Sequence, residues 1–472
     1  MVSTLLPAAA GFALGLQSLE SERRIEALPV EGTLPPWLSG TLLRNGPARF
    51  EVGRDNYRHW FDGLAMLHRF TFAAGGVSYA NRFLRSKRFA AAERAGHIVG
   101  GEFGTVAQLT FADRLRAPFG NGLTDNANVN IVPFRDGYLA LTETPGPVAF
   151  DGETLETRGT AKYDDALSAP LMTAHTHHDP ARRATFNVVI EMGRKSRYSV
   201  VRIPDGTLRR TVIASIAVDE PAYLHAFSTT ARYVIIAEYP LVVRPLDLLF
   251  GRKPFIENYR WKPDRATRFH VVDKDTGASA GVYETAAFFA FHHINAYDDG
   301  AAVVIDICAY DDHAIISDFT LDRLRAGAGV SRPSVRRYRL IPGRSAAEVE
   351  TISEVSLELP RVAPLREAGP YRFAYGFAGA AERPEFSDRI VKVDLASGSV
   401  SSWSQTRSYP GEPVFVARPG GTDEDDGVLL SVVLDAAAGS SYVVVLDART
   451  LEECARAAVP HHIPFGFHGI FR

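Results

Sequence analysis

The sequence predicts a closed all-β fold of the propeller type. Short apolar runs rich in Val, Ile, Phe and Tyr alternate with turn signals along the whole chain, and helical periodicity is scarce. No linker rich in Pro, Gly and Ser divides the 472 residues. Repeated hairpins without a linker favour radial repetition, because a propeller leaves only short and protected sheet edges. We therefore expect a single propeller domain over residues 1–472.

A short phrase recurs along the chain, in which an apolar residue precedes Asp and a small turn. It is found in FDGETL (150–155), VDKDTG (272–277), VDLASG (393–398) and LDARTL (446–451). Each copy is typical of a tight hairpin turn in which the Asp side chain bonds to the turn backbone. The repeats are too weak to give the number of blades.

Both ends of the chain are apolar. Chain ends usually fray in water, yet the tail HHIPFGFHGIFR (461–472) carries large apolar residues throughout. We expect this tail to be a closing strand that completes the first or the last blade. Residues 1–20 lack the Lys/Arg-rich start of a signal peptide, so we interpret them as an N-terminal extension, anchored or loose, with a signal peptide as the alternative.

The composition excludes several classes of protein. With 46% hydrophobic and 23% charged residues the chain is globular, and a net charge of −3 gives no electrostatic footprint for nucleic acid. Cys308 and Cys454 form no Cys-x-x-Cys pair, so neither a disulfide framework nor a cysteine-based zinc site is expected, and a reducing, cytoplasmic setting is the simplest assumption. No stretch of 18 apolar residues predicts a membrane span.

The sequence contains 14 histidines, and an isolated histidine is usually an ordinary hydrogen-bonding residue. Four have apolar or aromatic neighbours and fall in different presumed blades: His175, His225, His292 and His468. The innermost strands of a propeller converge on its axis, so one histidine from each of four blades could meet there. His177, His178 and His293 are competing candidates. Strand alternation puts His175 and His177 on the same face, so periodicity does not separate them.

Nine segments in this order resemble the carotenoid cleavage oxygenase family and cover nearly the whole chain. They are GTLLRNGP (40–47), HWFDGLAMLH (59–68), TDNANVN (124–130), ALTET (140–144), AHTHHDP (174–180), FHHINAYDD (291–299), YRFAYG (371–376), GEPVFVARP (411–419) and GFHGIF (466–471). The amino-acid sequences of these segments are most similar to the branch of the β-carotene oxygenases and the retinal pigment epithelium isomerase. The resemblance implies a seven-bladed propeller with iron on the axis and a cap of loops and helices over a substrate tunnel.

The same resemblance implies the site residues. The family's Ala-His, Tyr-x-His, His-x-x-Asn and Gly-Phe-His-Gly patterns match the metal ligands His175, His225, His292 and His468. The pattern His-x-x-Asn selects His292 over His293. Family glutamates that orient the last three ligands match Glu143, Glu358 and Glu412, in that order. A carboxylate that accepts the distal ring N–H makes the metal-binding nitrogen more basic. An ordinary surface or edge role is the alternative, above all for Glu358.

Four neutral imidazoles that fill part of an octahedron would leave room for dioxygen, whereas zinc prefers a closed tetrahedron and has no redox chemistry. The resemblance therefore implies Fe(II) as the cofactor. Thr142 resembles a family threonine whose methyl group crowds one open coordination position, and an ordinary strand threonine is the alternative.

The function that the resemblance implies is an iron(II)-dependent dioxygenase that splits a carotenoid or apocarotenoid double bond into aldehydes. Central 15,15′ cleavage of β-carotene to retinal is the leading expectation. The alternatives are a retinyl ester isomerohydrolase, which would use the same ligands, a stilbene-cleaving oxygenase, and a propeller that only binds. Residues 126–143 contain no Lys, which disfavours stilbene cleavage, and the full set of His and Glu motifs disfavours a scaffold.

The expected partners are the carotenoid and dioxygen, and a carotenoid substrate also implies contact with lipid. Residues 239–255 interleave Leu, Val and Phe with basic residues, which suits a peripheral membrane contact. A buried loop or helix between blades is the alternative. Animal relatives carry a Pro-Asp-Pro-Cys stretch after the position of EFGT (102–105), where this chain reads VAQLTFADRLRAPF, so tight attachment is in doubt. The sequence leaves the oligomeric state open.

Overall fold

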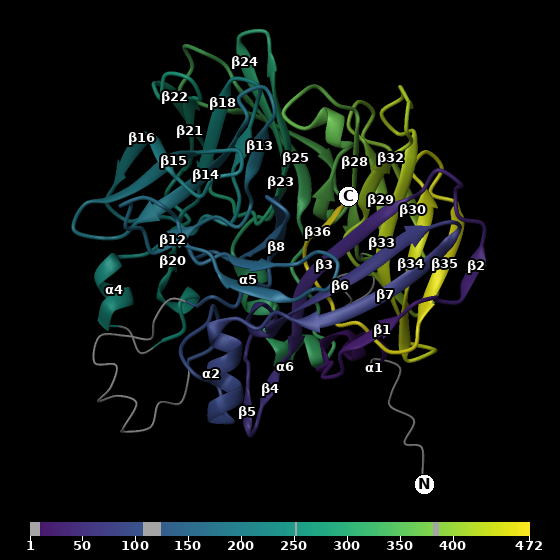
Figure 1. Ribbon diagram of the computed structural model, residues 1–472. Helices are drawn as coiled ribbons and strands as arrows, with labels where there is room; N and C mark the ends of the chain where they lie inside the picture. Colours follow the sequence, from purple (N-terminus) through teal and green to yellow (C-terminus); the bar gives the residue numbers. More distant parts are fainter. Residues whose placement is uncertain (1–9, 107–123, 251–252, 381–386) are drawn as a thin grey trace.

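The computed structural model describes residues 10–106, 124–250, 253–380 and 387–472. Seven antiparallel sheets form a seven-bladed β-propeller, which confirms the predicted fold class. The blades follow one another along the chain, and we number them in that order. Figure 1 shows that the described helices gather at one end of the propeller, where they cap it.

The strands of the first four blades have the following bounds. Blade 1 holds β1 (Arg23–Ile25), β3 (Gly40–Arg49), β6 (Leu64–Ala73), β7 (Gly76–Phe83) and β36 (Gly469–Phe471). Blade 2 holds β8 (Asn130–Phe134), β9 (Gly137–Leu141), β10 (Val148–Phe150) and β11 (Thr157–Thr160). Blade 3 holds β12 (Leu171–Met172), β13 (His177–Asp179), β14 (Ala184–Glu191), β15 (Ser196–Pro204) and β16 (Thr211–Val218). Blade 4 holds β17 (Ser228–Thr229), β18 (Tyr233–Glu238), β21 (Thr267–Asp273) and β22 (Ser279–Thr285).

The other three blades complete the ring. Blade 5 holds β23 (His293–Asp299), β24 (Ala302–Ala309), β25 (Ser334–Leu340) and β26 (Glu348–Ser353). Blade 6 holds β27 (Glu358–Arg361), β28 (Phe373–Ala378), β29 (Arg389–Asp394) and β30 (Val400–Trp403). Blade 7 holds β2 (Val30–Gly32), β31 (Ser408–Pro410), β32 (Val414–Ala417), β33 (Gly427–Asp435), β34 (Ser440–Asp447) and β35 (Glu453–Val459).

The remaining elements lie outside the blades. Two short pairs are β4 (Glu51–Val52) with β5 (Asp55–Asn56), and β19 (Leu241–Val242) with β20 (Arg260–Trp261). The helices are α1 (Ala10–Ala13), α2 (Lys87–Ala95), α4 (Pro245–Phe250), α5 (Ala314–Asp318) and α6 (Leu321–Arg325). The 3-10 turns are η1 (Leu14–Leu16), η2 (Trp60–Asp62), η3 (Ile256–Asn258) and η4 (Pro364–Arg366).

The recurring Asp phrase forms the outer hairpins of four blades, as predicted. It connects β10 to β11, β21 to β22, β29 to β30 and β34 to β35. Asp447 illustrates the cause, because its carboxylate accepts the backbone N–H of Arg449 at 2.8 Å and of Thr450 at 3.0 Å. These bonds satisfy turn amides that no neighbouring strand can reach.

Both chain ends close the ring. The C-terminal strand β36 pairs with β3 of blade 1, and the N-terminal strand β2 pairs with β35 of blade 7. The expected closing strand is therefore confirmed. The C-terminal tail packs closely against β3, since a Cβ on Gly46 would lie 2.4 Å from the Cα of Gly466. In the described part of the N-terminal extension, Phe12 and Leu16 are buried, and the ring of Phe12 lies 5.0 Å from that of Phe465.

Much of the apolar core lies between neighbouring blades. One cluster joins Leu42 and Phe70 of blade 1 to Leu430 and Val443 of blade 7. Toward the axis, consecutive inner strands contact one another, including β17 with β23, β23 with β27, β32 with β36, and β36 with β8. Because these inner strands converge on the axis, a residue at the end of one of them lies close to residues from several blades.

Candidate metal centre

Four histidines lie at the beginning of the innermost strands of four different blades. Each precedes its strand by one to three residues: His175 before β13, His225 before β17, His292 before β23 and His468 before β36. One ring nitrogen of each histidine lies within 4.8 Å of those of the other three. The structure thus brings together the four residues that the resemblance singled out, although they are far apart in the sequence.

Carboxylates orient three of the four rings. The Nδ1 atoms lie 2.6 Å from the carboxylate for His225 with Glu143, 2.5 Å for His292 with Glu358, and 2.7 Å for His468 with Glu412. These are the pairs that the resemblance implied. A carboxylate holds the proton on Nδ1, so Nε2 keeps a free lone pair.

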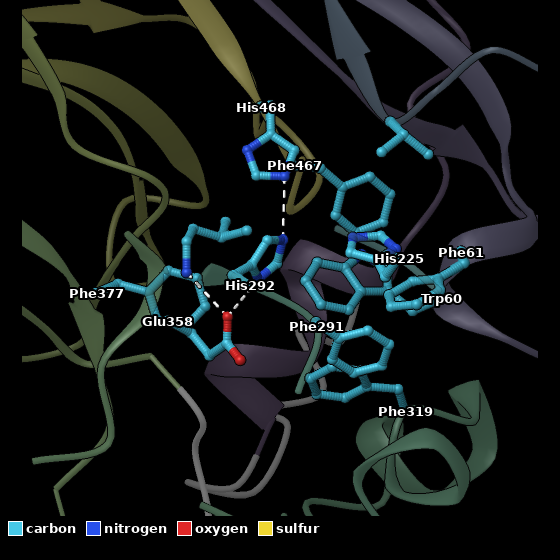
Figure 2. A pocket seen from close by; sticks show the side chains of 12 residues that line it. Trp60, Phe61, His225, Phe291, His292, Phe319, Glu358, Phe377, Phe467 and His468 are labelled. Atoms are coloured by element: carbon cyan, nitrogen blue, oxygen red, sulfur yellow. Dashed lines mark hydrogen bonds and ion pairs between the residues drawn. The ribbon is translucent and has the colours of Figure 1, made fainter. Parts of the chain in front are cut away.

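The Nε2 atoms face one another across the centre. Nε2 of His175 lies 3.1 Å from Nε2 of His225, and Nε2 of His292 lies 3.2 Å from Nε2 of His468. Figure 2 shows His292 between Glu358 and His468. Because the glutamates hold the protons of His292 and His468 on Nδ1, two lone pairs meet at this distance without a proton between them. A cation at the centre would satisfy both, so the residues fit a metal ion.

Burial keeps these groups in the protonation states that metal binding needs. It lowers the pKa of His175 well below its usual value and that of His468 to about 4, so both rings are neutral at pH 7. Burial alone would raise the pKa of Glu412, but the nearby guanidinium groups of Arg361 and Arg44 hold it well below its usual range. Glu412 is therefore a carboxylate and can accept the Nδ1 proton of His468.

The three glutamates have different outer partners. The hydroxyl of Tyr223 donates to Glu143 at 2.7 Å, and that of Tyr310 donates to Glu358 at 2.8 Å. Glu412 instead binds two guanidinium groups, those of Arg44 and Arg361. Sequence reasoning did not find these partners. Arg44 lies within the matching segment GTLLRNGP and Tyr223 within the Tyr-x-His pattern, and these were the only signals for their roles.

The neighbouring histidines are used elsewhere. Nε2 of His177 lies 2.9 Å from the carbonyl oxygen of Phe227. His293 uses both ring nitrogens, with Nδ1 at 2.6 Å from the Ser228 hydroxyl and Nε2 at 2.8 Å from the Tyr239 hydroxyl. The exposed ring of His178 lies 3.1 Å from Asp205. Their partners explain why these rings do not turn toward the centre.

An apolar cavity opens onto the histidines, with an empty volume of about 450 Å³. Its lining contains His225, His292, His468, Glu358 and the following apolar residues: Trp60, Phe61, Val129, Phe291, Leu359, Phe319, Phe377 and Phe467. Phe319 comes from the turn between α5 and α6, and Trp60 and Phe61 come from η2, so the cap helps to form the cavity. Thr142 lies directly after β9 and is not among the lining residues, whereas Val129 is.

Residues 239–255 divide into a buried and an exposed part. The first part is buried, as expected for a loop or helix between blades, and it contains Tyr239, Leu241, Val242 and Val243. Arg244 and Lys253 are exposed, and 63% of Leu246 on α4 is accessible. Residues 251–252, and residues 107–119 of the segment that differs from the animal relatives, lie outside the described residues. Within the described chain, no helix is both long and apolar enough to cross a membrane.

Comparison with known proteins identifies the family. The model of the family described as retinal pigment epithelial membrane protein matches residues 16–472. The chain is 35% identical to a mitochondrial carotenoid-cleaving dioxygenase of Macaca fascicularis, over 97% of this chain and 93% of that protein. The chain belongs to the carotenoid cleavage oxygenase family. Another member, the chloroplastic carotenoid cleavage dioxygenase 8 homolog A of rice (Oryza sativa subsp. japonica), is 37% identical over 96% of this chain and 86% of its own.

Solved structures of the family share the whole fold. A Synechocystis apocarotenoid oxygenase in which one Glu is replaced by Gln is 28% identical, covers 98% of this chain and 99% of its own, and superposes with a TM-score of 0.89. A cobalt-substituted form of the Synechocystis oxygenase is 29% identical, with the same coverage and a TM-score of 0.89. The resemblance inferred from nine short segments is thus confirmed over nearly the full length of the chain.

Proposed function

We propose that His175, His225, His292 and His468 hold iron(II), and that the protein uses it to cleave a double bond of a carotenoid or apocarotenoid with dioxygen. The observation that carries this proposal is the meeting of four Nε2 atoms, three of them on rings whose Nδ1 faces a glutamate, at the edge of an apolar, aromatic cavity. Membership of a family whose named relatives cleave carotenoids supports the substrate class.

Iron fits the donor set better than zinc does for this task. Four neutral imidazoles add no negative charge, and an octahedral ion bound by four of them keeps positions for other ligands. Zinc would close a tetrahedron with the same four residues and has no redox chemistry. When bound, iron(II) supplies the electron transfer that allows dioxygen to react with an alkene.

The protein's own residues position the substrate and exclude water. Phe61, Phe291, Phe319 and Phe467 offer ring faces and edges to a flat polyene, and they place its target bond beside the histidines. Cleavage breaks one C=C bond, and each of the two new carbonyl groups takes one atom of dioxygen. The atoms and electrons balance without a reductant or a proton donor. The neutral rings of His175 and His468 agree with a reaction that needs no general acid.

The finer assignment is central cleavage of β-carotene at the 15,15′ bond to give retinal, and it rests on similarity to the animal branch. The test is aerobic incubation of iron-loaded protein with β-carotene, or with an apocarotenal, in detergent and ¹⁸O₂. We expect retinal as the main product with labelled aldehyde oxygen. Longer apocarotenals would overturn only the bond assignment. Unchanged carotenoids together with turnover of a retinyl ester would overturn the dioxygenase.

We include a peripheral membrane contact in this proposal. The apolar substrate partitions into lipid, and exposed Leu246 lies near exposed Arg244 and Lys253 in the sequence. Co-sedimentation with anionic vesicles tests it. We expect Leu246→Asp to weaken vesicle binding, whereas Val349→Asp, at an exposed valine of blade 5, should leave it unchanged.

A further inference from the structure

One short strand of blade 6 serves two of the histidines at once. Glu358, the first residue of β27, binds Nδ1 of His292 at 2.5 Å. Arg361, its last residue, donates from Nε to Glu412 at 2.8 Å, and Glu412 in turn binds Nδ1 of His468 at 2.7 Å. These four consecutive residues therefore take part in the outer support of both facing histidines.

A regular strand could not do this. Neighbouring side chains of a strand point to opposite faces, so residues three positions apart, such as Glu358 and Arg361, would point away from each other. In β27 the register shifts: Glu358 pairs with Phe377 and Arg361 with Tyr375, so three steps on one strand match two on the other. This β-bulge lets both side chains point to the axis.

The bulge depends on an unusual backbone conformation at Leu359. Its φ is 45°, in the left-handed region that residues with a Cβ rarely adopt. In this conformation the N–H of Leu359 donates to Glu358 Oε2 at 3.0 Å, the same oxygen that binds His292. A strained backbone conformation persists only where the surrounding contacts hold it in place, and residues with such a conformation cluster at functional sites.

Arg361 joins three blades at the axis. Besides Glu412 of blade 7 it binds the carbonyl oxygen of Gly469, the residue after His468, at 2.7 Å. The N–H of Gly469 donates to Glu412 Oε2 at 2.9 Å. Arg361 therefore holds both the carboxylate that orients His468 and the strand β36 that carries it.

We propose that Arg361 is a positioning residue for the metal ligand His468, and that the left-handed bulge at Leu359 is the device that lets one strand position His292 and His468 together. This inference rests on the proposed function, because it assumes that the histidines bind a metal. It assigns to Arg361 an effect on metal binding that is separate from any contribution to folding.

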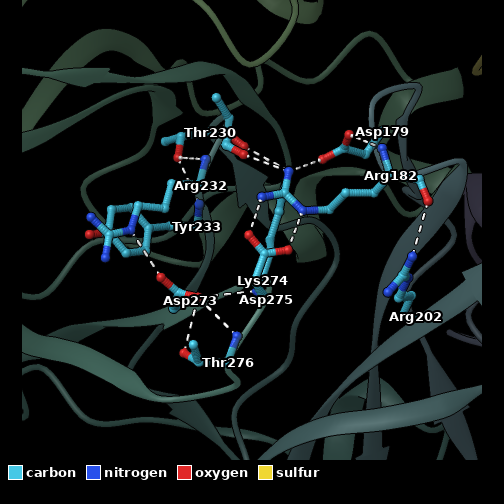
Figure 3. A network of polar contacts seen from close by, with 11 residues as sticks. Asp179, Arg182, Arg202, Thr230, Arg232, Tyr233, Asp273, Lys274, Asp275 and Thr276 are labelled. Atoms are coloured by element: carbon cyan, nitrogen blue, oxygen red, sulfur yellow. Dashed lines mark hydrogen bonds and ion pairs between the residues drawn. The ribbon is translucent and has the colours of Figure 1, made fainter.

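The chain offers matched controls for both residues. Arg182 also binds carboxylates, Asp179 and Asp275, together with a backbone carbonyl, and it joins two blades away from the centre (Figure 3). Leu451, with a φ of 61°, is a buried leucine in the same backbone region within the β34–β35 hairpin. Neither residue contacts the histidines.

The experiment titrates metal-depleted full-length protein with Co²⁺ and records both the affinity and the visible absorption of the bound ion. Arg361→Gln and Leu359→Val are expected to weaken binding by about 10–100-fold and to change the absorption bands, as loss of outer-layer support does. Arg361→Lys should weaken metal binding as Arg361→Gln does, because an ammonium lacks the planar guanidinium fork that reaches two acceptors. Leu359→Gly, which tolerates a positive φ, should retain more affinity than Leu359→Val. Arg182→Gln and Leu451→Val should bind as the wild type does.

Wild-type affinity and absorption in Arg361→Gln would overturn the inference, and so would an equal loss in Arg182→Gln, because general destabilisation would then be the cause. Thermal unfolding of each metal-free variant verifies that it is folded. If a substitution at Arg361 prevents folding, the pair Leu359→Val and Leu359→Gly decides: equal affinities for the two would overturn the inference. A wild-type protein that takes up no metal would refute the proposed function itself.

Discussion

The Nε2 atoms of His292 and His468 lie 3.2 Å apart, although each ring donates its Nδ1 proton to a glutamate. Two lone pairs at this distance repel, and His468 cannot relieve the contact by taking a proton without leaving the neutral state that burial favours. The folded chain therefore holds an unfavourable arrangement that a cation would turn into a favourable one.

Metal removal should lower the stability of the protein. A ligand that binds only the folded state stabilises it by about 2.7 kcal/mol at a free concentration of 100 times its Kd. We expect chelation to lower the melting temperature and Fe²⁺ or Co²⁺ to restore it. Differential scanning calorimetry with and without metal measures the effect, and an unchanged melting temperature at saturating metal would contradict it.

Substitution of a histidine in the centre and of one outside it should have different effects. His468→Ala removes an Nε2 atom from the centre, so we expect loss of stoichiometric metal and of cleavage activity. His177→Gln replaces a ring whose Nε2 binds the Phe227 carbonyl oxygen, and it should keep the metal. Elemental analysis of the purified variants provides the measurement. Metal loss in His177→Gln but not in His468→Ala would mean that the ligand set is wrong.

The three glutamates should differ in their effect on stability. Glu143→Gln, Glu358→Gln and Glu412→Gln should each reduce metal retention by roughly 10–100-fold. Only Glu412→Gln leaves Arg44 and Arg361 without their carboxylate, and breaking a buried ion pair costs about 3–5 kcal/mol. Urea unfolding of the metal-free variants should therefore show the largest loss for Glu412→Gln, and equal stabilities would argue against this assignment.

Acid stability should depend on a histidine outside the centre. Burial lowers the pKa of His68 to about 3, while an unfolded chain titrates near its ordinary value of about 6.5. Between these values the unfolded state binds a proton that the folded state does not, so this contribution to stability is lost as the pH falls. In His68→Gln the slope of unfolding free energy against pH should be smaller by about 1.4 kcal/mol per unit between pH 6 and 4. Parallel slopes for the two proteins would contradict it.

Trimming the cavity should change catalysis without changing metal uptake. Phe319→Leu removes part of a ring that lines the cavity and packs against the rings of Trp60, Phe61 and Phe291. A change of one methylene group in an apolar pocket is worth about 10–200-fold, so we expect kcat/KM for the carotenoid to fall at least about tenfold. Phe415→Leu, at a buried ring between blades that is not in the lining, is the control. An equal loss of kcat/KM in both variants would point to general destabilisation.

Local patterns predicted the local features well. The four Asp turns depend on bonds between residues two or three positions apart, such as Asp447 with Arg449, so the sequence alone was sufficient. The apolar tail around Phe465 and Phe467 indicated a closing strand because burial of large apolar residues at a chain end needs a partner surface.

The candidate ligands needed motif resemblance, since alternation along a strand gives His175 and His177 the same face. The structure separates them by their surroundings. His177 meets the carbonyl oxygen of Phe227 from the next blade, while His175 meets Nε2 of His225. Which of two like residues reaches the axis depends on strand ends that come from another blade, and strand alternation does not contain that information.

By itself, the sequence determined the fold class, the outer hairpins, the closing tail and the set of His and Glu motifs, because each depends on short-range order or on wording shared with a family. Only the tertiary structure decided which aromatic rings line the cavity, that Val129 lies among them, and that Arg361 binds the glutamate that faces His468. These features arise where inner strands of different blades converge. Their geometry depends on a register shift at Leu359 and on contacts between residues far apart in the chain, and neither leaves a periodic trace in the sequence.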